Sequence, residues 1–349
     1  MYSKKNVDYI VVGFGIAGVS FCNQLELQNK TFVVFDEGVG STSKSGGIFN
    51  PTILKRFTAA WNASEFYPFA VQFYLSLSAK LKINIFQDTS ILRILHSPEE
   101  QNNWTVASGK QSLQEYLVTD PVSNTNVNIL APFGLGKVVG SAKIHKDKLL
   151  QVYREFLVSY GNLKSENFEY STLKIEADHV EYKDIVAKKI VFCEGPKVLL
   201  NPFFPKDAII PNKGEFLIIH APELKLEMLL KGPVYIIPLG DDLYKAGATY
   251  NRDDFSENTT SKAREQILSK VERMIKCSFE VVGQTAGVRP TTRDRKPLLG
   301  NNIDSPQVTF FNGLGTHGLL MAPFLSKVLY DYLEKGTPIP QQMDIKRVY

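Results

Sequence analysis

The sequence predicts an α/β protein in which a βαβ-based domain with a parallel sheet is interleaved with a smaller antiparallel-sheet domain. A buried strand, a helix and a second buried strand follow one another in residues 8–13, 16–28 and 31–36. Later, residues 215–249 alternate apolar and polar side chains around a turn at residues 240–242, as antiparallel strands do. The pattern of buried strands returns after this stretch, so we expect the chain to pass repeatedly between the two domains.

The remaining elements can be placed in order along the chain. A loop rich in glycine and serine spans residues 38–47, and helical patterning follows over 58–81. Residues 82–139 are mixed, with polar breaks at 96–103 and 120–126. Beyond them the sequence predicts helices over 146–159, 261–276 and 319–334, and strands over 188–195, 279–288 and 308–312. We expect residues 1–80, 140–205 and 285–349 to form the βαβ-based domain, and residues 81–139 and 206–284 to form the other.

Length and composition narrow the class of protein. A chain of 349 residues exceeds what one hydrophobic core usually serves, and 44% hydrophobic with 22% charged residues is ordinary for a globular protein. The net charge of +4 is scattered, without a run of like charges, so a nucleic-acid partner is disfavoured but not excluded. The three cysteines lack metal or redox spacing, which favours a reducing compartment and no metal site.

The N-terminal region resembles a signal peptide at first sight. Lys4 and Lys5 precede an apolar run over residues 9–21. Glycines interrupt that run, and no small-residue cleavage site follows it. No stretch of 18 consecutive apolar residues occurs anywhere, which predicts no membrane span. We therefore expect a cytoplasmic protein.

The motif GFGIAG stands between the first predicted strand and helix. Gly13 allows a tight turn, Gly15 lets a pyrophosphate approach the backbone, and Gly18 lets the helix pack closely on the strand. The positive end of the helix, which begins with Ile16 and Ala17, then faces the phosphates. A carboxylate at Asp36 would accept hydrogen bonds from ribose hydroxyls and would repel the 2′-phosphate of NADP. The alternative is a tight turn that binds nothing.

Two further glycine-bearing segments resemble turns that bind ligands through their backbone. The stretch STSKSGGIFNP at residues 41–51 follows Asp36 closely, and by itself it is equally typical of a flexible loop. Near the other end, FNGLGTHGLLMAP at residues 311–323 is a glycine-rich turn that runs into a predicted helix. Such a turn lets backbone N–H groups approach an anion or a polar ligand edge.

These segments resemble the D-amino-acid oxidase and glycine oxidase family of flavoenzymes, which also contains sarcosine oxidase and the flavin domain of a bacterial tRNA-modifying enzyme. The resemblance covers most of the chain in order, and residues 82–139 match it only loosely. Besides the segments above, it includes KIVFCEG, NKGEFLII, YIIPLGDDLYKAGAT and AGVRPTTRDRKPLLG. It implies a Rossmann-like βαβ domain that binds FAD, roofed by the antiparallel sheet.

The resemblance also implies roles for the glycine-rich turns. The N-terminal turn, with Asp36 or the neighbouring Glu37, would hold the adenylate and pyrophosphate of FAD. The C-terminal turn would face the pyrimidine edge of the flavin, where negative charge gathers on reduction. The other residues implied near the cofactor are Ser43, Ser45, Gly46, Gly47, Gly195, Gly313, Gly315, Thr316, His317 and Gly318.

Three side chains are candidates for the substrate side. Arg289 matches the position at which the family grips a substrate carboxylate, although a strand-borne arginine can equally form a structural ion pair. Tyr235 is either a pocket residue or a core tyrosine. His317 is either a catalytic residue or a local hydrogen-bond partner, because hydride transfer from a neutral amine needs no base.

The resemblance implies an FAD-dependent oxidoreductase that oxidises the C–N bond of an amino acid or N-substituted glycine, with reoxidation by oxygen. Alternatives are a dehydrogenase with another electron acceptor, a flavoenzyme that modifies tRNA or another amine, and a flavin-binding protein without turnover. The expected partner is a small amino acid or amine.

Overall fold

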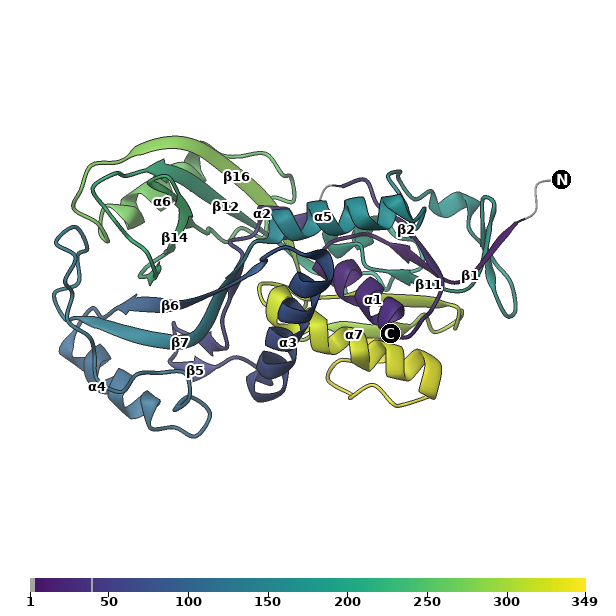
Figure 1. Cartoon of the computed structure of the whole chain (residues 1–349), viewed down its shortest axis with the longest axis horizontal. Coiled ribbons are helices and arrows are strands. Elements are labelled where there is room, and N and C mark those ends of the chain that lie inside the picture. Colours follow the sequence, from purple (N-terminus) through teal and green to yellow (C-terminus); the bar gives the residue numbers. More distant parts are fainter. Residues whose placement is uncertain (1–3, 39) are drawn as a thin grey trace.

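The computed structural model describes residues 4–38 and 40–349, so residues 1–3 of the predicted first domain and residue 39 of the predicted 38–47 loop lie outside it. Two eight-stranded sheets form the two lobes of the molecule (Figure 1). A small hairpin of β4 (Thr52–Ile53) and β5 (Thr58–Ala59) lies apart from both. No helix in the described part of the chain is long and apolar enough to cross a membrane.

The first sheet contains the predicted βαβ unit. Its strands follow the order β17-β18-β11-β1-β2-β8, and β10 and β9 extend it beside β11. The central strands β2, β1, β11 and β18 pair in parallel, and the β-branched residues of β1 are buried on both faces. The bounds are β1 (Lys5–Val12), β2 (Phe32–Phe35), β8 (Leu163–Lys164), β9 (Lys174–Ile175), β10 (Val180–Tyr182), β11 (Ile185–Phe192), β17 (Leu298–Asn301) and β18 (Val308–Asn312).

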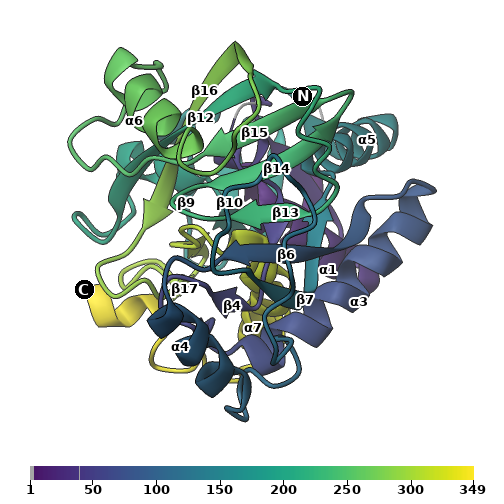
Figure 2. The ribbon, with the colours of Figure 1, turned by 90° about the vertical axis from the view of Figure 1, so that its left-hand side faces the viewer.

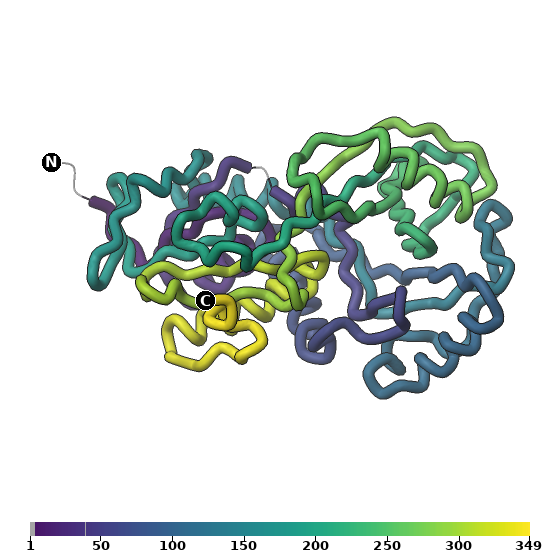
Figure 3. Tube along the Cα trace, turned by 180° about the vertical axis from the view of Figure 1, so that it is seen from behind, coloured from purple at the N-terminus to yellow at the C-terminus, as the bar shows by residue number. Residues whose placement is uncertain are grey.

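Helices cover one face of this sheet, and aromatic side chains cover the other. The helical core joins residues from distant parts of the sequence, among them Phe21, Tyr74, Tyr153 and Leu325. Phe168, Tyr182 and Phe192 pack together on the opposite face. The helices are α1 (Ile16–Leu27), α2 (Ser41–Lys44), α3 (Ala63–Leu81), α5 (Lys146–Ser159) and α7 (Gly318–Lys335). Figure 3 shows the first and last segments of the chain side by side in this lobe.

The second sheet is mostly antiparallel. Its order is β16-β12-β15-β14-β13-β6-β7-β3, and the labelled strands follow one another from β16 to β7 in Figure 2. Helices α4 (Pro98–Ser108) and α6 (Ser261–Val271) pack on opposite faces of it. The strands are β3 (Ile48–Phe49), β6 (Phe86–Ile94), β7 (Leu135–Ile144), β12 (Ile210–His220), β13 (Leu229–Lys231), β14 (Tyr235–Gly240), β15 (Leu243–Gly247) and β16 (Glu280–Thr291).

The chain passes back and forth between the sheets. It builds β1 and β2 in the first, β3, β6 and β7 in the second, β8–β11 in the first, β12–β16 in the second, and β17 and β18 in the first. The predicted domain boundaries stay a prediction. The sheets differ from them in detail, because β3 and residues 285–291 of β16 pair in the second sheet although we assigned them to the first domain.

Several predicted elements differ at their ends. Helix α3 begins at Ala63 rather than at residue 58, because Thr58 and Ala59 pair with the preceding strand. Helix α6 ends at Val271 instead of residue 276. The predicted polar break at 96–103 is wrong, since it is the start of α4: Ser97 accepts a hydrogen bond from the Glu100 N–H (3.1 Å) and caps the helix.

Candidate active site

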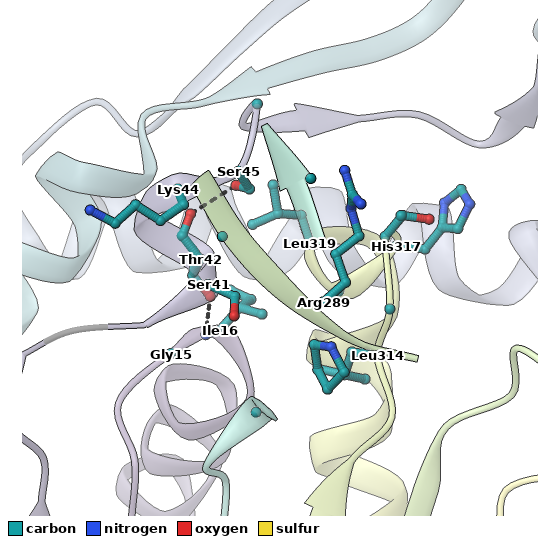
Figure 4. Close-up of a pocket in the computed structure, with 18 of the residues that line it drawn as sticks. Gly15, Ile16, Ser41, Thr42, Lys44, Ser45, Arg289, Leu314, His317 and Leu319 are labelled. Atoms are coloured by element: carbon teal, nitrogen blue, oxygen red, sulfur yellow. Dashed lines mark hydrogen bonds between the residues drawn. The ribbon is translucent and has the colours of Figure 1, made fainter. Parts of the chain in front are cut away.

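A cavity of about 890 Å³ lies where the two lobes meet, at the upper end of the range for ligand sites. Its walls come from the start of α1, the loop around residues 41–47, the end of β11, strands β12–β16 and the start of α7. Figure 4 shows labelled residues from α1, α2, β16 and α7 around this space. Segments from both ends of the chain therefore meet at one site.

The N-terminal glycines shape the turn between β1 and α1. Gly13 has φ +94°, and a Cβ there would lie 2.6 Å from the carbonyl oxygen of Cys193. Gly15 is the N-cap of α1 and lines the cavity with Ile16 and Ala17. Gly18 does not line the cavity, because it packs on the turn itself: a Cβ there would lie 2.0 Å from the Gly13 carbonyl oxygen.

Asp36 lines the cavity at the end of β2, and its carboxylate is already engaged within the chain. Oδ1 accepts a hydrogen bond from the Phe14 N–H (2.8 Å), and Oδ2 accepts one from the Gly38 N–H (2.7 Å). Oδ2 also pairs with the guanidinium of Arg154 on α5. The carboxylate thus fixes the turn around it as well as facing the cavity. Glu37 also lines the cavity and pairs with Lys197.

The loop around residues 41–47 lies against the start of α1. Thr42 Oγ1 accepts a hydrogen bond from the Ile16 N–H (3.0 Å), a contact drawn in Figure 4. Of the four residues in this loop that we expected near the cofactor, Ser45, Gly46 and Gly47 line the cavity and Ser43 does not. Ser43 faces a smaller cavity of about 380 Å³ beside Asp36 and Arg154, because the short helix α2 turns its side chain away.

Two buried lysines hold this loop by its backbone. Lys146 Nζ donates to the Ser43 carbonyl oxygen (2.6 Å), and Lys245 Nζ donates to the carbonyl oxygens of Lys44 and Ser45 (both 2.9 Å). Burial lowers the pKa of Lys245 to about 8. The conformation of the loop therefore depends on residues from α5 and β15.

The C-terminal turn meets the same cavity from the first sheet. Gly315, Thr316, His317 and Gly318 line it, so the N-terminus of α7 opens toward it. Gly313 does not line it, because it packs on the 290s loop: a Cβ there would lie 2.9 Å from Thr292 Cγ2. Burial lowers the pKa of His317, which favours a neutral imidazole.

Gly195 lines the cavity just after the end of strand β11. Its φ is +57°, and no atom lies within 4 Å of the place where a Cβ would stand. Its carbonyl oxygen accepts a hydrogen bond from Asn312 Nδ2 (2.9 Å). A glycine with open space over it, a helix N-terminus and the Asp36 carboxylate together fit a dinucleotide.

Arg289 lines the cavity from strand β16. Its Nη1 donates to Asn212 Oδ1 (3.2 Å), and both Nη atoms donate to the Thr249 carbonyl oxygen (3.3 Å each). The guanidinium lies 4.6 Å from the ring centroid of Tyr250 and directly over Gly214, where a Cβ would lie 2.0 Å from Nη2. It has no carboxylate partner within 4.0 Å in residues 4–38 and 40–349. The structural ion pair considered for Arg289 is thus not formed within the described chain.

Tyr235 lines the cavity and is partly exposed to it. Its hydroxyl accepts a hydrogen bond from Asn50 Nδ2 (3.3 Å), and burial raises its pKa to about 12. The phenol therefore stays protonated at neutral pH and can donate a hydrogen bond to a bound ligand.

A family model described as FAD dependent oxidoreductase matches residues 8–332. The chain belongs to this family. It is therefore an FAD-dependent oxidoreductase, and FAD is its cofactor. The residues that fit the dinucleotide, chiefly Gly13, Gly15, Asp36 and Gly195, are those we propose to hold it.

The relatives agree with this family. The chain is 24% identical to a glycine oxidase of Bacillus subtilis over 95% of this chain and 94% of that protein. It is 24% identical to the bifunctional tRNA 5-methylaminomethyl-2-thiouridine biosynthesis protein MnmC of Campylobacter jejuni, over 86% of this chain and 47% of that protein. The fold matches the crystal structure of glycine oxidase from Geobacillus kaustophilus with a TM-score of 0.76, at 16% identity and 95% coverage of both chains.

The structure adds residues that the sequence did not single out. Thr42 contacts the start of α1, Arg154 pairs with Asp36, and Lys245 holds the loop around residues 41–47. Gly214 and Tyr250 contact Arg289. Of these, only Gly214 carries a local signal, as a glycine inside strand β12, where glycine marks a close approach; the predicted antiparallel stretch began one residue later, at residue 215. The others are ordinary polar residues that acquire a role from the tertiary fold.

Proposed function

We propose that this protein oxidises the C–N bond of an amino acid or N-substituted glycine, and that Arg289 binds the substrate carboxylate. The observation that supports this most is a cavity-lining guanidinium without an anionic partner in the described chain. A guanidinium fork holds a carboxylate bidentately and so fixes the position of the α-carbon. The glycine oxidase relatives are consistent with such a substrate.

The flavin of bound FAD supplies the acceptor for a hydride from the α-carbon. Loss of that hydride and of the nitrogen proton leaves an imine, which water hydrolyses to a carbonyl compound and an amine. The protein orients the substrate through Arg289 and excludes water with the walls of the cavity. The neutral His317 and the protonated Tyr235 can donate or accept hydrogen bonds there, and neither is required as a base.

The test is anaerobic reduction of the FAD-loaded protein by a panel of amino acids, N-substituted glycines and their decarboxylated analogues. Bleaching of the flavin by acids and not by the matched amines supports the proposal. Equal bleaching by both, or by neither, contradicts it. Measuring hydrogen peroxide in air then tests oxygen as the acceptor, because a dehydrogenase with another acceptor would reoxidise slowly and form little peroxide.

A second candidate is oxidation of a modified amine on tRNA. The MnmC relatives, which match over 86% of the chain, favour it. A gel-shift measurement with total tRNA tests it directly. Binding that weakens steeply with salt would support this candidate, since phosphate contacts release counterions.

A further inference from the structure

The far end of the cavity carries a second group of basic side chains. Arg93, Lys231 and Tyr235 are paired in neighbouring strands, because Lys231 lies opposite Arg93 on β6 and opposite Tyr235 on β14. Directly paired residues point to the same face of a sheet, and all of them line the cavity. The other charged or titratable residues that line this end are Lys55, His96, Glu100 and Lys270.

The charges in this group do not balance. The one carboxylate, Glu100, pairs with Arg93 at 3.1 Å. Lys231 Nζ donates to the Gly232 carbonyl oxygen (2.6 Å) and lies 4.9 Å from the Tyr235 ring centroid. No carboxylate lies within 4.0 Å of it in the part of the chain that the structure describes. Burial and the neighbouring cations Arg93, Lys270 and Lys55 lower the pKa of Lys231 to about 8, as expected for an ammonium without a counter-ion.

An uncompensated, partly buried cation costs folding free energy, so a ligand that supplies the missing anion is a reason for its presence. Arg289 is likewise a cavity-lining cation without an anionic partner in the described chain. Among the described residues, Arg289 and Lys231 are therefore two unpaired cations on one face of the second sheet, in addition to Lys55 and Lys270, which line the cavity from a loop and from α6.

The distance between the two cations follows from the sheet. Lys231 pairs with Tyr235, and Tyr235 pairs with Gly247, so two strand spacings of roughly 4.8 Å separate β13 from β15. The guanidinium of Arg289 lies at the Thr249 carbonyl, just beyond the end of β15. The Arg289 guanidinium also lies over Gly214 of β12, one strand beyond β15, so the backbone positions beneath the two charges are roughly 10–15 Å apart, too far for the single carboxylate of a simple amino acid to reach both.

We infer that Lys231 forms a second anion-binding position, and that the substrate is an elongated amino acid or N-substituted glycine with a further carboxylate at its far end. This inference rests on the proposed function, in which Arg289 takes the first carboxylate. A small carboxylate is favoured over a phosphate backbone because Lys231 lies inside the cavity, between β6 and β14, rather than on an open groove.

The experiment compares matched pairs of N-alkylglycines and N-(carboxyalkyl)glycines with progressively longer spacers. Anaerobic flavin reduction by the FAD-loaded protein gives kcat/KM for each. We expect the diacid to exceed its monoacid about tenfold or more at one best spacer length, the effect of one charge-assisted hydrogen bond. Shorter diacids should gain less, because their second carboxylate does not reach Lys231.

Lys231→Met should abolish the preference for the diacid and leave the monoacid within about twofold. Lys231→Gln repeats the test with a polar side chain in case the first variant folds poorly. Lys262→Met is the matched control, because Lys262 is an exposed residue of α6 that does not line the cavity. This control should keep the full preference.

Two results overturn the inference while leaving the proposed function intact: monoacids as effective as diacids at every spacer length, or a preference that survives in Lys231→Met. Loss of tRNA binding in Lys231→Met, without a diacid preference in the parent protein, assigns the position to a phosphate and also overturns it. If no compound reduces the flavin, the proposed function fails. Titration with adipate against hexanoate, followed by the flavin absorbance, then decides the anion position alone.

Discussion

Replacing Arg289 with methionine removes the guanidinium and keeps an unbranched side chain of similar reach. The guanidinium has no anionic partner in the described chain, so a substrate carboxylate is the anion that loses its partner. Asn212 Oδ1 and the Thr249 carbonyl oxygen each lose a neutral hydrogen bond as well. Removing one member of a desolvated charge pair costs about 2–5 kcal/mol. At about 1.4 kcal/mol per factor of ten, kcat/KM for a carboxylate substrate should fall roughly 30- to 4,000-fold.

The assay pairs an amino acid with its decarboxylated analogue on the parent protein and on Arg289→Met. The acid should lose most of its advantage, while the slow reaction of the amine should stay nearly unchanged. FAD should remain bound, because Arg289 stands on β16, away from the α1 turn. An equal loss for both compounds would show that Arg289 only supports the fold, and the assignment of an amino-acid substrate would lose its main support.

The same variant makes an unusual prediction for stability. Burial lowers the pKa of Arg289, which means that the surroundings disfavour its charged form. Methionine removes this desolvation cost, and that gain offsets the lost hydrogen bonds to Asn212 and the Thr249 carbonyl. We therefore expect Arg289→Met to unfold at the same temperature as the parent protein or a higher one, measured with equal FAD saturation. A clear drop in unfolding temperature would contradict this reasoning.

Three further variants test other contacts. Gly214→Ala places a Cβ 2.0 Å from the Arg289 guanidinium, so it should lower kcat/KM for acids in the same direction as Arg289→Met and keep FAD; unchanged kinetics would show that the guanidinium moves freely. Asp36→Ala should weaken FAD binding by roughly 1–3 kcal/mol, since charge-assisted hydrogen bonds have that value. Glu37→Ala, at the other candidate carboxylate, should weaken it less, because Glu37 is engaged by Lys197; equal FAD retention on dilution in Asp36→Ala and the parent would refute the role of Asp36. Lys245→Met tests a pH dependence: the folded pKa of about 8 lies below the usual 10.5, so the unfolded chain binds more protons between these values. The free energy of unfolding of the parent should therefore rise relative to Lys245→Met from pH 8 to pH 10, and parallel curves would contradict a lowered pKa of Lys245 in the folded protein.

The parts of the fold with strong local patterns could be predicted from the sequence. Helix α5 and strand β18 have the predicted bounds, and α1 differs by one residue. Helix α5 repeats its buried apolar residues at helical spacing, whereas β18 and most of α1 are continuous buried runs next to glycine-rich turns. Residues 82–139 could not be read. Helix α4 buries few side chains, so its apolar pattern is weak, and its one clear signal was the cap Ser97-Pro98-Glu99-Glu100.

Some residues of the candidate site could be predicted from local sequence patterns, and others could not. The glycine-rich turns were visible because a close approach of backbone to backbone or to a ligand needs glycine at a fixed spacing. Even there, Gly18 and Gly313 serve packing rather than the cavity wall. Lys231 and Arg93 carry no local signal at all, since strands β13 and β6 are far apart in the sequence and meet only in the sheet.

The passage of the chain between the two sheets has a consequence for how the protein is made. Strand β1 needs β11 beside it, β11 needs β18, and the last wall of the cavity is the start of α7. On the ribosome, the glycine turn after β1 emerges well before β11, β18 and the start of α7 are synthesised. A nascent chain therefore holds only part of the dinucleotide site until residues 308–320 have left the exit tunnel. Capture of FAD should accordingly follow the synthesis of residues 308–320, and the cofactor cannot stabilise the early β-strands before then.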